Sequence, residues 1–310
     1  MRTLLEAAVR APSSHNTQPW VFRLSESGIS LLADRTRALP ANDPDDRELA
    51  ISCGAALFNI RVAAASIGAE AQVSVLPDQG DDDLLAIVKL NGGPPISDQV
   101  SRLYVEIPRR RTYRKRFAAK RVPESALLEL AYAAEHEGAW LVMLSDEAMR
   151  QQVAKLIAEG DAVQWANRSW RRELAAWMHP RRKGDGLTVP GLVAPIAQAV
   201  VRTFDMGNGI GAKDSQLAEE SPVLLVLGTQ GDGQADWLKA GQALERLLLT
   251  ACQSGLQASY LNQPIQTASL RPKLQHSIGS LGFPQVLLRI GFPAEDLPAT
   301  PRRSLEAVIE

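Results

Sequence analysis

The chain has 310 residues, 45% of them hydrophobic, and 34 Lys and Arg balance 35 Asp and Glu to a net charge of −1. This length suits one large domain or two ordinary ones, and the balanced charge excludes a general attraction to nucleic acid. The two cysteines, Cys53 and Cys252, favour buried thiols in a reducing cytoplasm over a disulfide. No secretory h-region and no stretch approaching about 18 apolar residues is evident, so we expect neither export nor a membrane span.

The N-terminal residues predict a short helix, because Thr3 and Glu6 have the spacing of a capping box. The stretch "APSSHNTQPW" (11–20) follows, with hydroxyl, imidazole, carboxamide and indole groups and almost nothing aliphatic. Such compact hydrogen-bonding groups suit the polar edge of a flat ligand. The alternative is an ordinary turn with an N-cap serine before a strand, with Trp20 and Phe22 in the core.

A strand is expected at 29–36, a helix at 54–71 and a strand at 84–93. The helix is apolar around most of its circumference, so it should lie at the centre of the protein. Gly68 is suited to a left-handed cap at its end.

Positive charge is concentrated in "RRRTYRKRFAAKR" (109–121), which has eight cations in thirteen positions and no acid. Arg110, Thr112 and Arg114 share one face if the segment is extended. Two guanidinium groups and a hydroxyl suit a phosphate, because arginine binds its oxygens bidentately. A solvated charged face and a nucleic-acid patch are the alternatives.

A long segment, about 145–220, follows. Part of it, 165–186, holds three of the six tryptophans, interleaved with arginines. It either covers a pocket as a lid, packs on a partner, or is a helical excursion whose tryptophans complete the core. Gly207, Gly209 and Gly211 resemble a dinucleotide loop, but the third glycine comes one residue early and no strand precedes them, so we reject that reading.

The last third of the chain repeats the earlier order, with a strand at 222–229, a helix at 241–258 and a strand at 285–293. The second helix aligns without gaps on the first at a constant offset of 187 residues. The identical pairs are Gly54/Gly241, Ala56/Ala243, Leu57/Leu244, Ala64/Ala251, Gly68/Gly255 and Ala71/Ala258.

This repetition predicts an α+β chain of two related halves, 1–103 and 104–310, with the insertion at about 145–220 in the second half. Chance similarity between two helices rich in alanine and leucine is the alternative.

An amino-acid catalytic constellation is not evident. The four histidines have no metal-ligand spacing, so we expect no metal site, and no G-x-S-x-G elbow frames Ser13 or Ser14. If the protein is an enzyme, a cofactor is expected to carry the chemistry.

Four stretches together resemble the nitroreductase family of FMN-dependent flavoproteins: 11–22, 109–117, 255–261 and 285–309. The resemblance covers most of the chain except roughly 145–220, and it implies a nitroreductase-like fold with FMN as cofactor. By position it implies Ser13, Ser14, Asn16 and Gln18 near the isoalloxazine, Arg110, Thr112, Arg114 and Arg302 around the ribityl and phosphate, and Asn262 and Gln263 near the reactive edge.

Ordinary family members carry both motifs in one chain, arginine motif first, and bind flavins at a homodimer interface. Here the order is reversed and each half has one motif, which resembles the duplicated subfamily that includes the mycobacterial Acg proteins. One chain would then resemble a nitroreductase dimer, bind one FMN and act as a monomer, although a homodimer stays open. Thr112 replaces the usual serine, and Phe117 lies one residue late.

The resemblance leaves two functions open. As a cytoplasmic oxidoreductase, the protein would take a hydride from NADH or NADPH and reduce a quinone or nitroaromatic acceptor. As a binding protein, it would store or sequester FMN behind a lid. Neither a nucleic acid nor a membrane is expected as a partner.

Overall fold

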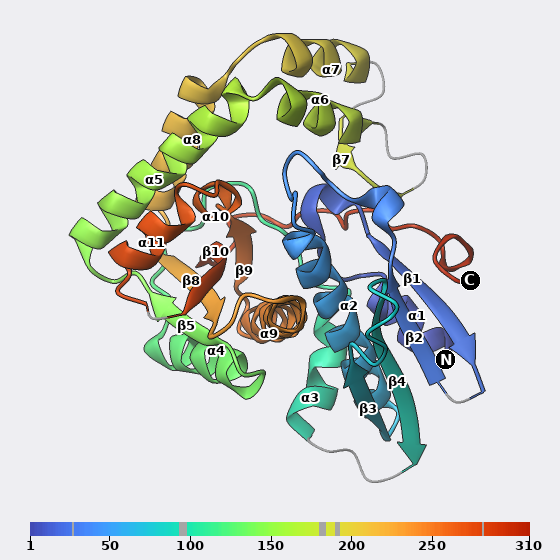
Figure 1. Ribbon diagram of the computed structural model, residues 1–310. Helices are drawn as coiled ribbons and strands as arrows, with labels where there is room; N and C mark the ends of the chain where they lie inside the picture. The colour runs from blue at the N-terminus through green and yellow to red at the C-terminus, as the bar shows by residue number, and fades with distance from the viewer. Residues whose placement is uncertain (27, 93–97, 180–183, 190–192, 281) are drawn as a thin grey trace.

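Residues 1–310, except 27, 93–97, 180–183, 190–192 and 281, are described by a computed structural model. Its described part is an α+β fold with two four-stranded antiparallel sheets, one on each side of a central pair of helices (Figure 1). The first sheet has the order β1-β2-β4-β3 and the second the order β5-β8-β10-β9.

The first half begins with a short helix and then forms its sheet around one long helix. Met1, not Thr3, precedes the first helix and no side chain caps it, so the predicted capping box is wrong; Glu6 instead pairs with Arg2 at 2.9 Å. The elements are α1 (Arg2–Ala8), β1 (Trp20–Ser25), β2 (Gly28–Ala33), α2 (Arg47–Ser66), β3 (Ala69–Val75), β4 (Leu84–Gly92) and α3 (Asp98–Arg102).

The second half has the same kinds of element, separated by an inserted group of helices. Its sheet and helices are α4 (Glu124–His136), β5 (Trp140–Met143), β8 (Val223–Thr229), α9 (Gln234–Gln253), β9 (Gln257–Tyr260), α10 (Gln263–Gln266), α11 (Arg271–Ser277) and β10 (Phe283–Gly291). The insertion consists of α5 (Glu147–Ala166), α6 (Arg168–Trp177), β6 (Met178–His179), β7 (Leu187–Thr188), α7 (Ala194–Thr203) and α8 (Gly207–Glu219).

The two sheets are connected in the same way. The order β1, β2, α2, β3, β4 corresponds to β5, β8, α9, β9, β10, and each set gives the same strand order in space. Helices α2 and α9 are each 20 residues long, and their first residues keep the offset of 187. Gly68 and Gly255 follow them with the same φ of +73°, as expected for glycines that end a helix. The two sets of elements therefore correspond in order and position, and a duplication of the chain stays a prediction.

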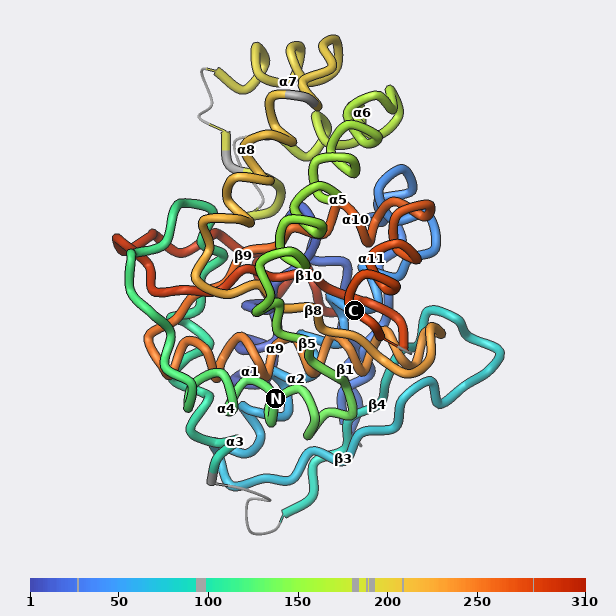
Figure 2. The backbone as a smooth tube through the Cα atoms, turned by 90° about the vertical axis from the view of Figure 1, so that its left-hand side faces the viewer, coloured from blue at the N-terminus to red at the C-terminus, as the bar shows by residue number. Residues whose placement is uncertain are grey.

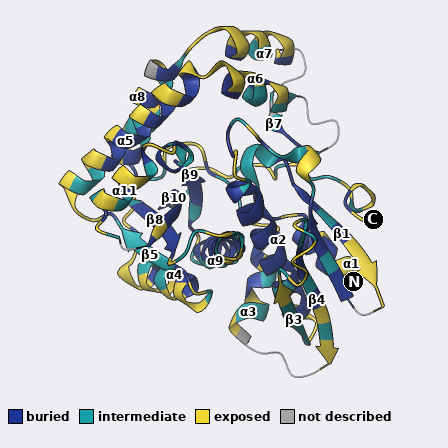
Figure 3. Cartoon of the chain, in the orientation of Figure 1, coloured by how far each residue is buried: buried dark blue, intermediate teal, exposed yellow. Residues whose placement is uncertain are grey.

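Helices α2 and α9 pack against each other between the sheets, and both are buried along most of their length (Figure 3). Contrary to the expectation from sequence, α2 is long and apolar enough to cross a membrane, with a mean hydropathy of 1.5. However, 83% of that stretch is buried inside the protein. It is therefore the core helix of the first half. Both cysteines are free and buried, as predicted.

The C-terminal tail crosses back to the first half. Phe22 donates its backbone N–H to the carbonyl of Val308 at 2.7 Å, and Glu310 donates to the carbonyl of Phe22 at 3.0 Å. The tail thereby pairs with the free edge of β1. The predicted second half, 104–310, therefore also contributes backbone to the sheet of the first half. Trp20 and Phe22 are fully buried, which places both rings in the core.

Helices α5 to α8 form an arm that rises from the second half and reaches over the first (Figures 1 and 2). The short strand β7 at its far end lies above the loop that precedes β1 (Figure 1). Gly207, Gly209 and Gly211 belong to the first turns of α8, in agreement with rejecting a dinucleotide loop.

Candidate functional site

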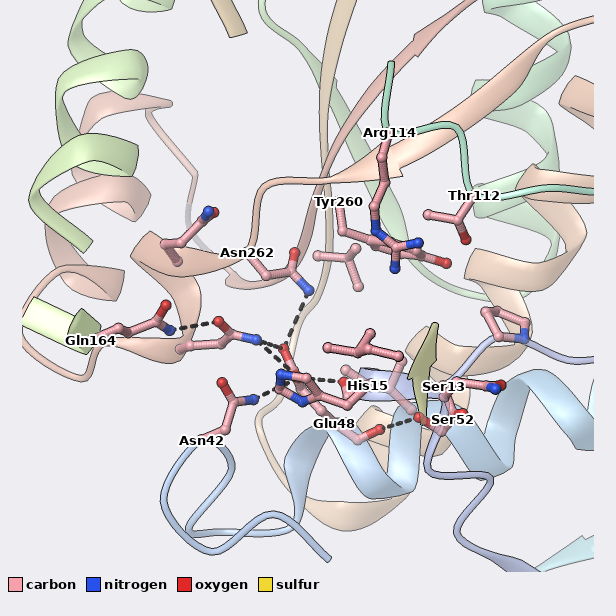
Figure 4. Close-up of a pocket in the computed structure, with 18 of the residues that line it drawn as sticks. Ser13, His15, Asn42, Glu48, Ser52, Thr112, Arg114, Gln164, Tyr260 and Asn262 are labelled. Atoms are coloured by element: carbon pink, nitrogen blue, oxygen red, sulfur yellow. Dashed lines mark hydrogen bonds between the residues drawn. The ribbon is translucent and has the colours of Figure 1, made fainter. Parts of the chain in front are cut away.

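A cavity of about 360 Å3 lies where the two halves and the arm meet (Figure 4). Its wall combines segments that are far apart in the sequence, from the stretch before β1 to the C-terminal tail. The residues that line it include Ser13, Ser14, His15, Asn16, Asn42, Glu48, Thr112, Arg114, Asp161, Gln164, Trp165, Trp170, Leu244, Tyr260, Asn262, Gln263, Gln266, Val286 and Arg302.

The stretch Ser13–Gln18 enters the cavity as a tight turn with an uncommon backbone. His15, Asn16 and Gln18 have φ values of +50°, +55° and +53°, in a region that non-glycine residues rarely adopt. The Ser13 hydroxyl stabilises this shape, because it accepts the backbone N–H of Gln18 at 2.9 Å. Strained backbone of this kind persists where surrounding contacts fix it, often at functional sites.

The carboxylate of Glu48, in the first turn of α2, forms the floor of the cavity. It accepts hydrogen bonds from the Ser14 hydroxyl at 2.5 Å and from the side-chain amides of Asn262 at 3.2 Å and Gln266 at 2.9 Å. The Asn42 amide adds a fourth bond at 3.3 Å. Ser14 and Asn262, two of the predicted site residues, are thereby oriented by one buried acid.

His15 lies beside Glu48 in the cavity wall (Figure 4). Its Nδ1 is buried and has no hydrogen-bond partner among the described residues. Burial lowers the pKa of His15 to about 4, and this effect outweighs the opposing charge of Glu48. The imidazole is therefore neutral at neutral pH.

Another part of the cavity wall is positive. Arg114 and Arg302 both line it, together with the Thr112 hydroxyl and the ring of Tyr260. In the part of the chain that the structure describes, the Arg114 guanidinium has neither a hydrogen bond nor an ion pair, and the buried Tyr260 hydroxyl has no partner. Burial raises the pKa of Tyr260 to about 12, so it remains a donor. These groups can receive an anionic ligand.

Three other cations of the basic run form ion pairs with residues that do not line the cavity. Arg109 pairs with Glu106, Lys115 with Glu295 and Arg116 with Glu220. This part of the run is a surface of solvated ion pairs, which was one of the alternatives.

Two predicted site residues, Arg110 and Gln18, are not among the described residues that line the cavity. Arg110 lies behind the wall, where its Nε is 3.7 Å from the fully buried carboxylate of Glu245. Gln18 is fully buried and donates to the carbonyl of Gly184 at 2.9 Å, while its own oxygen accepts from the Arg303 backbone at 2.9 Å. Both support the wall from outside.

The arm contributes directly to the cavity. Asp161, Gln164 and Trp165 line it from α5 and Trp170 from α6, and the Trp170 indole donates to Asn42 at 2.9 Å. Residues of α5 and α6 therefore form part of the cavity wall, and the role of the arm as a lid stays a prediction.

The tight turn also holds the arm in place. The Asn16 amide donates to the carbonyl of Gly186 at 3.3 Å, and the Gly186 N–H donates to the Asn16 carbonyl at 3.2 Å. Arg37 forms an ion pair with Asp185 in the same loop. Asn16 and Gln18 therefore bind the arm, a role that their positions in the motif did not predict.

Glu48, Tyr260, Asp161 and the two tryptophans were not proposed as site residues from sequence. Glu48 carries a weak signal, since it is a charged residue at the start of an otherwise apolar helix. Asp161 carries none, because only the folding of α5 over the cavity brings it there.

No protein-family model matches the chain. "Putative NAD(P)H nitroreductase Rv3131" of Mycobacterium tuberculosis is 35% identical over 320 residues, covering 100% of this chain and 91% of the relative. "Putative NAD(P)H nitroreductase acg" of the same organism is 28% identical over 316 residues, covering 99% and 94%. The solved structure of nitroreductase A from Vibrio parahaemolyticus is 13% identical, with a TM-score of 0.44, over 67% of this chain and 74% of the other.

Proposed function

Because the chain belongs to the nitroreductase family, we propose that its cavity binds one FMN and that the protein is an NAD(P)H-dependent oxidoreductase. The observation that carries this proposal is the unpartnered Arg114 guanidinium at one end of a cavity whose other end is a hydrogen-bonded carboxylate cage. A ligand with an anionic tail and a flat polar ring matches both ends.

The donor set fits FMN. Arg114 and Arg302, with the Thr112 and Tyr260 hydroxyls, offer charged and neutral donors to a phosphate and ribityl chain. Leu244, Val286 and the two lining tryptophans offer apolar surface to a ring. A volume of about 360 Å3 lies in the range of about 300–1,000 Å3 typical of small-molecule sites.

One site per chain is proposed because the cavity uses a segment that the second half lacks. In the first half, residues 9–19 connect α1 to β1 and carry the tight turn. In the second half, only residues 137–139 connect α4 to β5. This short connection cannot supply a second Ser13–Gln18 turn.

FMN held in the cavity would supply hydride transfer from NADH or NADPH to an acceptor, for which we propose quinones and nitroaromatics. The chain's own contribution is positioning and electrostatics. Arg114 and Arg302 would hold the phosphate, and neutral His15, Ser14 and Asn262 would present polar atoms to the ring. The arm would limit the access of water and shape the space for the second substrate.

Storage of FMN is the second candidate, and one specific observation favours it. The arm is held over the cavity by the hydrogen bonds of Asn16 and Gln18 and by the Arg37–Asp185 ion pair. A cover held in this way slows ligand exchange and restricts the access of a nicotinamide.

Anaerobic mixing of FMN-loaded protein with NADH or NADPH tests the proposal against storage. We expect the visible absorbance of the flavin to bleach with at least one nucleotide and to return when a quinone is added. A flavin that stays oxidised with both nucleotides, yet is reduced by dithionite, contradicts the oxidoreductase and supports storage.

A further inference from the structure

The arm brings two carboxyl groups together at the cavity. Asp161 of α5 and Asp214 of α8 both accept hydrogen bonds from the side-chain amide of Gln263, whose Nε2 lies 3.3 Å from Asp161 Oδ1 and 2.8 Å from Asp214 Oδ2. Asp161 and Gln263 line the cavity, and Asp161 is only 3% exposed.

The geometry of this cluster is tightly constrained. Gly160 lies so close to the backbone of residue 263 that a methyl group added to it would be 2.8 Å from the carbonyl carbon of Gln263. This contact fixes Asp161, the next residue of α5, against Gln263. A group that must meet a substrate in one orientation benefits from such support.

Little positive charge compensates the pair. Among the described residues no cation forms an ion pair with either carboxyl group, although Lys213 and the buried Arg289 lower the pKa of Asp214 to some extent. Burial, and then the charge of Asp214, raise the pKa of Asp161 to about 7, against a smaller lowering by Gln263. Two neighbouring carboxyl groups that cannot both ionise retain one proton between them.

We propose that Asp161 is the proton donor to the quinone acceptor of the proposed function, with Asp214 and Gln263 as positioning residues. The inference rests on the proposed function. Reduction of a quinone by two electrons requires one hydride and one proton. The hydride comes from NAD(P)H by way of the bound cofactor. This hydride forms one O–H bond of the hydroquinone. The O–H bond of Asp161 breaks as the second O–H bond of the hydroquinone forms, and water returns a proton to the carboxylate.

A comparison of acceptors tests this assignment. FMN-loaded protein is reduced with dithionite, which bypasses the nicotinamide, and is mixed anaerobically with a soluble benzoquinone or with ferricyanide, which takes electrons without a proton. General acid catalysis contributes roughly 10²- to 10⁴-fold, so we expect Asp161→Asn to slow oxidation by the quinone by about 10²-fold and to leave oxidation by ferricyanide unchanged. Glu159→Gln, an exposed change on the same helix, is expected to alter neither.

The pH dependence gives a second readout that separates a proton donor from a structural residue. Oxidation of the reduced wild-type protein by the quinone should fall as the pH rises through about 7, and this dependence should vanish in Asp161→Asn. In the apoprotein, NMR of 13C-labelled aspartate should place the titration of Asp161 near neutral pH and move it lower in Asp214→Asn.

Equal slowing with quinone and ferricyanide, or an Asp161 that titrates near its ordinary value of about 3.9, overturns the assignment. A protein that neither nicotinamide reduces, but whose dithionite-reduced form shows the quinone-specific defect, contradicts the proposed function and leaves the role of Asp161 standing.

Discussion

Gly54 of α2 and Gly241 of α9 face each other where the two central helices cross. A methyl group on Gly54 would lie 2.2 Å from the carbonyl oxygen of Leu238, and one on Gly241 would lie 2.0 Å from the carbonyl oxygen of Ile51. Gly54 and Gly241 are separated by 187 residues, and so are Ile51 and Leu238. The contact of Gly54 with Leu238 is therefore equivalent to the contact of Gly241 with Ile51. The two halves are joined here through a pseudo-symmetric contact that no larger residue permits.

We expect Gly241→Ala to lower the free energy of unfolding by about 1–3 kcal/mol, because the helices must separate to admit the methyl group. Gly209→Ala is the control: this glycine also lies in a helix, but nothing is within 4 Å of an added methyl group. There, alanine should be neutral or stabilising by up to about 1 kcal/mol. Denaturant titration of both variants measures the difference, and equal effects would contradict a close crossing.

Arg114→Ala should weaken the binding of FMN by about 1.5–3 kcal/mol, or roughly 10- to 100-fold in affinity. The affinity for riboflavin should hardly change, because only FMN has the phosphate. Arg116→Ala, which removes only an exposed ion pair with Glu220, should change neither affinity. Fluorescence titration of the apoproteins with both ligands gives the result. Equal losses for FMN and riboflavin would show that Arg114 does not bind the phosphate.

Arg110→Ala should act differently, by destabilising the fold. Burial raises the pKa of the fully buried Glu245 carboxyl group, and Arg110 opposes that rise more strongly than Asn59 or Arg302 does, so its loss leaves the carboxyl group without its main compensating charge. Breaking a buried ion pair from one side typically costs about 3–5 kcal/mol. Thermal unfolding of the apoprotein measures this loss of stability. A variant with wild-type stability and a lower affinity for FMN but not for riboflavin would show instead that Arg110 binds the phosphate.

Arg110 and Arg114 were predicted to share one face, but only Arg114 lines the cavity. Their spacing places them on one face of a regular strand, but the segment changes conformation between them. Arg110 donates its backbone N–H to the carbonyl of Glu106, as in a helical turn, whereas Tyr113 donates to Ala258, as in a strand. The local pattern predicted a phosphate site, and the long-range pairing decides which arginine faces the cavity.

The central helices were predictable because their periodicity and their shared glycines are local features. Both helices begin and end earlier than the aligned stretches, since Gly68 and Gly255 turn the chain into β3 and β9. The hydrogen bonds to Glu48 and the contacts of Asn16 and Gln18 with the arm were not predictable, because in each case the partners come from distant segments.

Asp161 should make stability depend on pH. Its pKa is raised on folding to about 7, so the folded state binds the proton more tightly, and stability falls as the pH rises from about 4 to about 7. Asp161→Asn removes this penalty. We therefore expect the stability of Asp161→Asn, relative to that of wild type, to be higher at pH 8 than at pH 4. Thermal unfolding of both apoproteins at the two pH values measures this difference. Glu159→Gln should show no such gain, and a difference for Asp161→Asn that is the same at both pH values would be inconsistent with a raised pKa.

Asp185→Asn should release bound FMN faster, because it weakens the ion pair with Arg37 that holds the arm over the cavity. Lys273→Ala, which removes an exposed ion pair with Glu159 on α5, should not. The rate at which flavin fluorescence appears after dilution measures release. Identical rates in wild type and Asp185→Asn would show that the arm does not retain the ligand.

The proposed function depends on a single FMN site built from both halves of one chain. To count the sites, the protein is loaded with excess flavin, the unbound fraction is removed, the protein is denatured, and the flavin released per chain is identified and quantified. We expect one FMN per chain. Two FMN per chain, FAD in place of FMN, or no retained flavin would contradict a single FMN site.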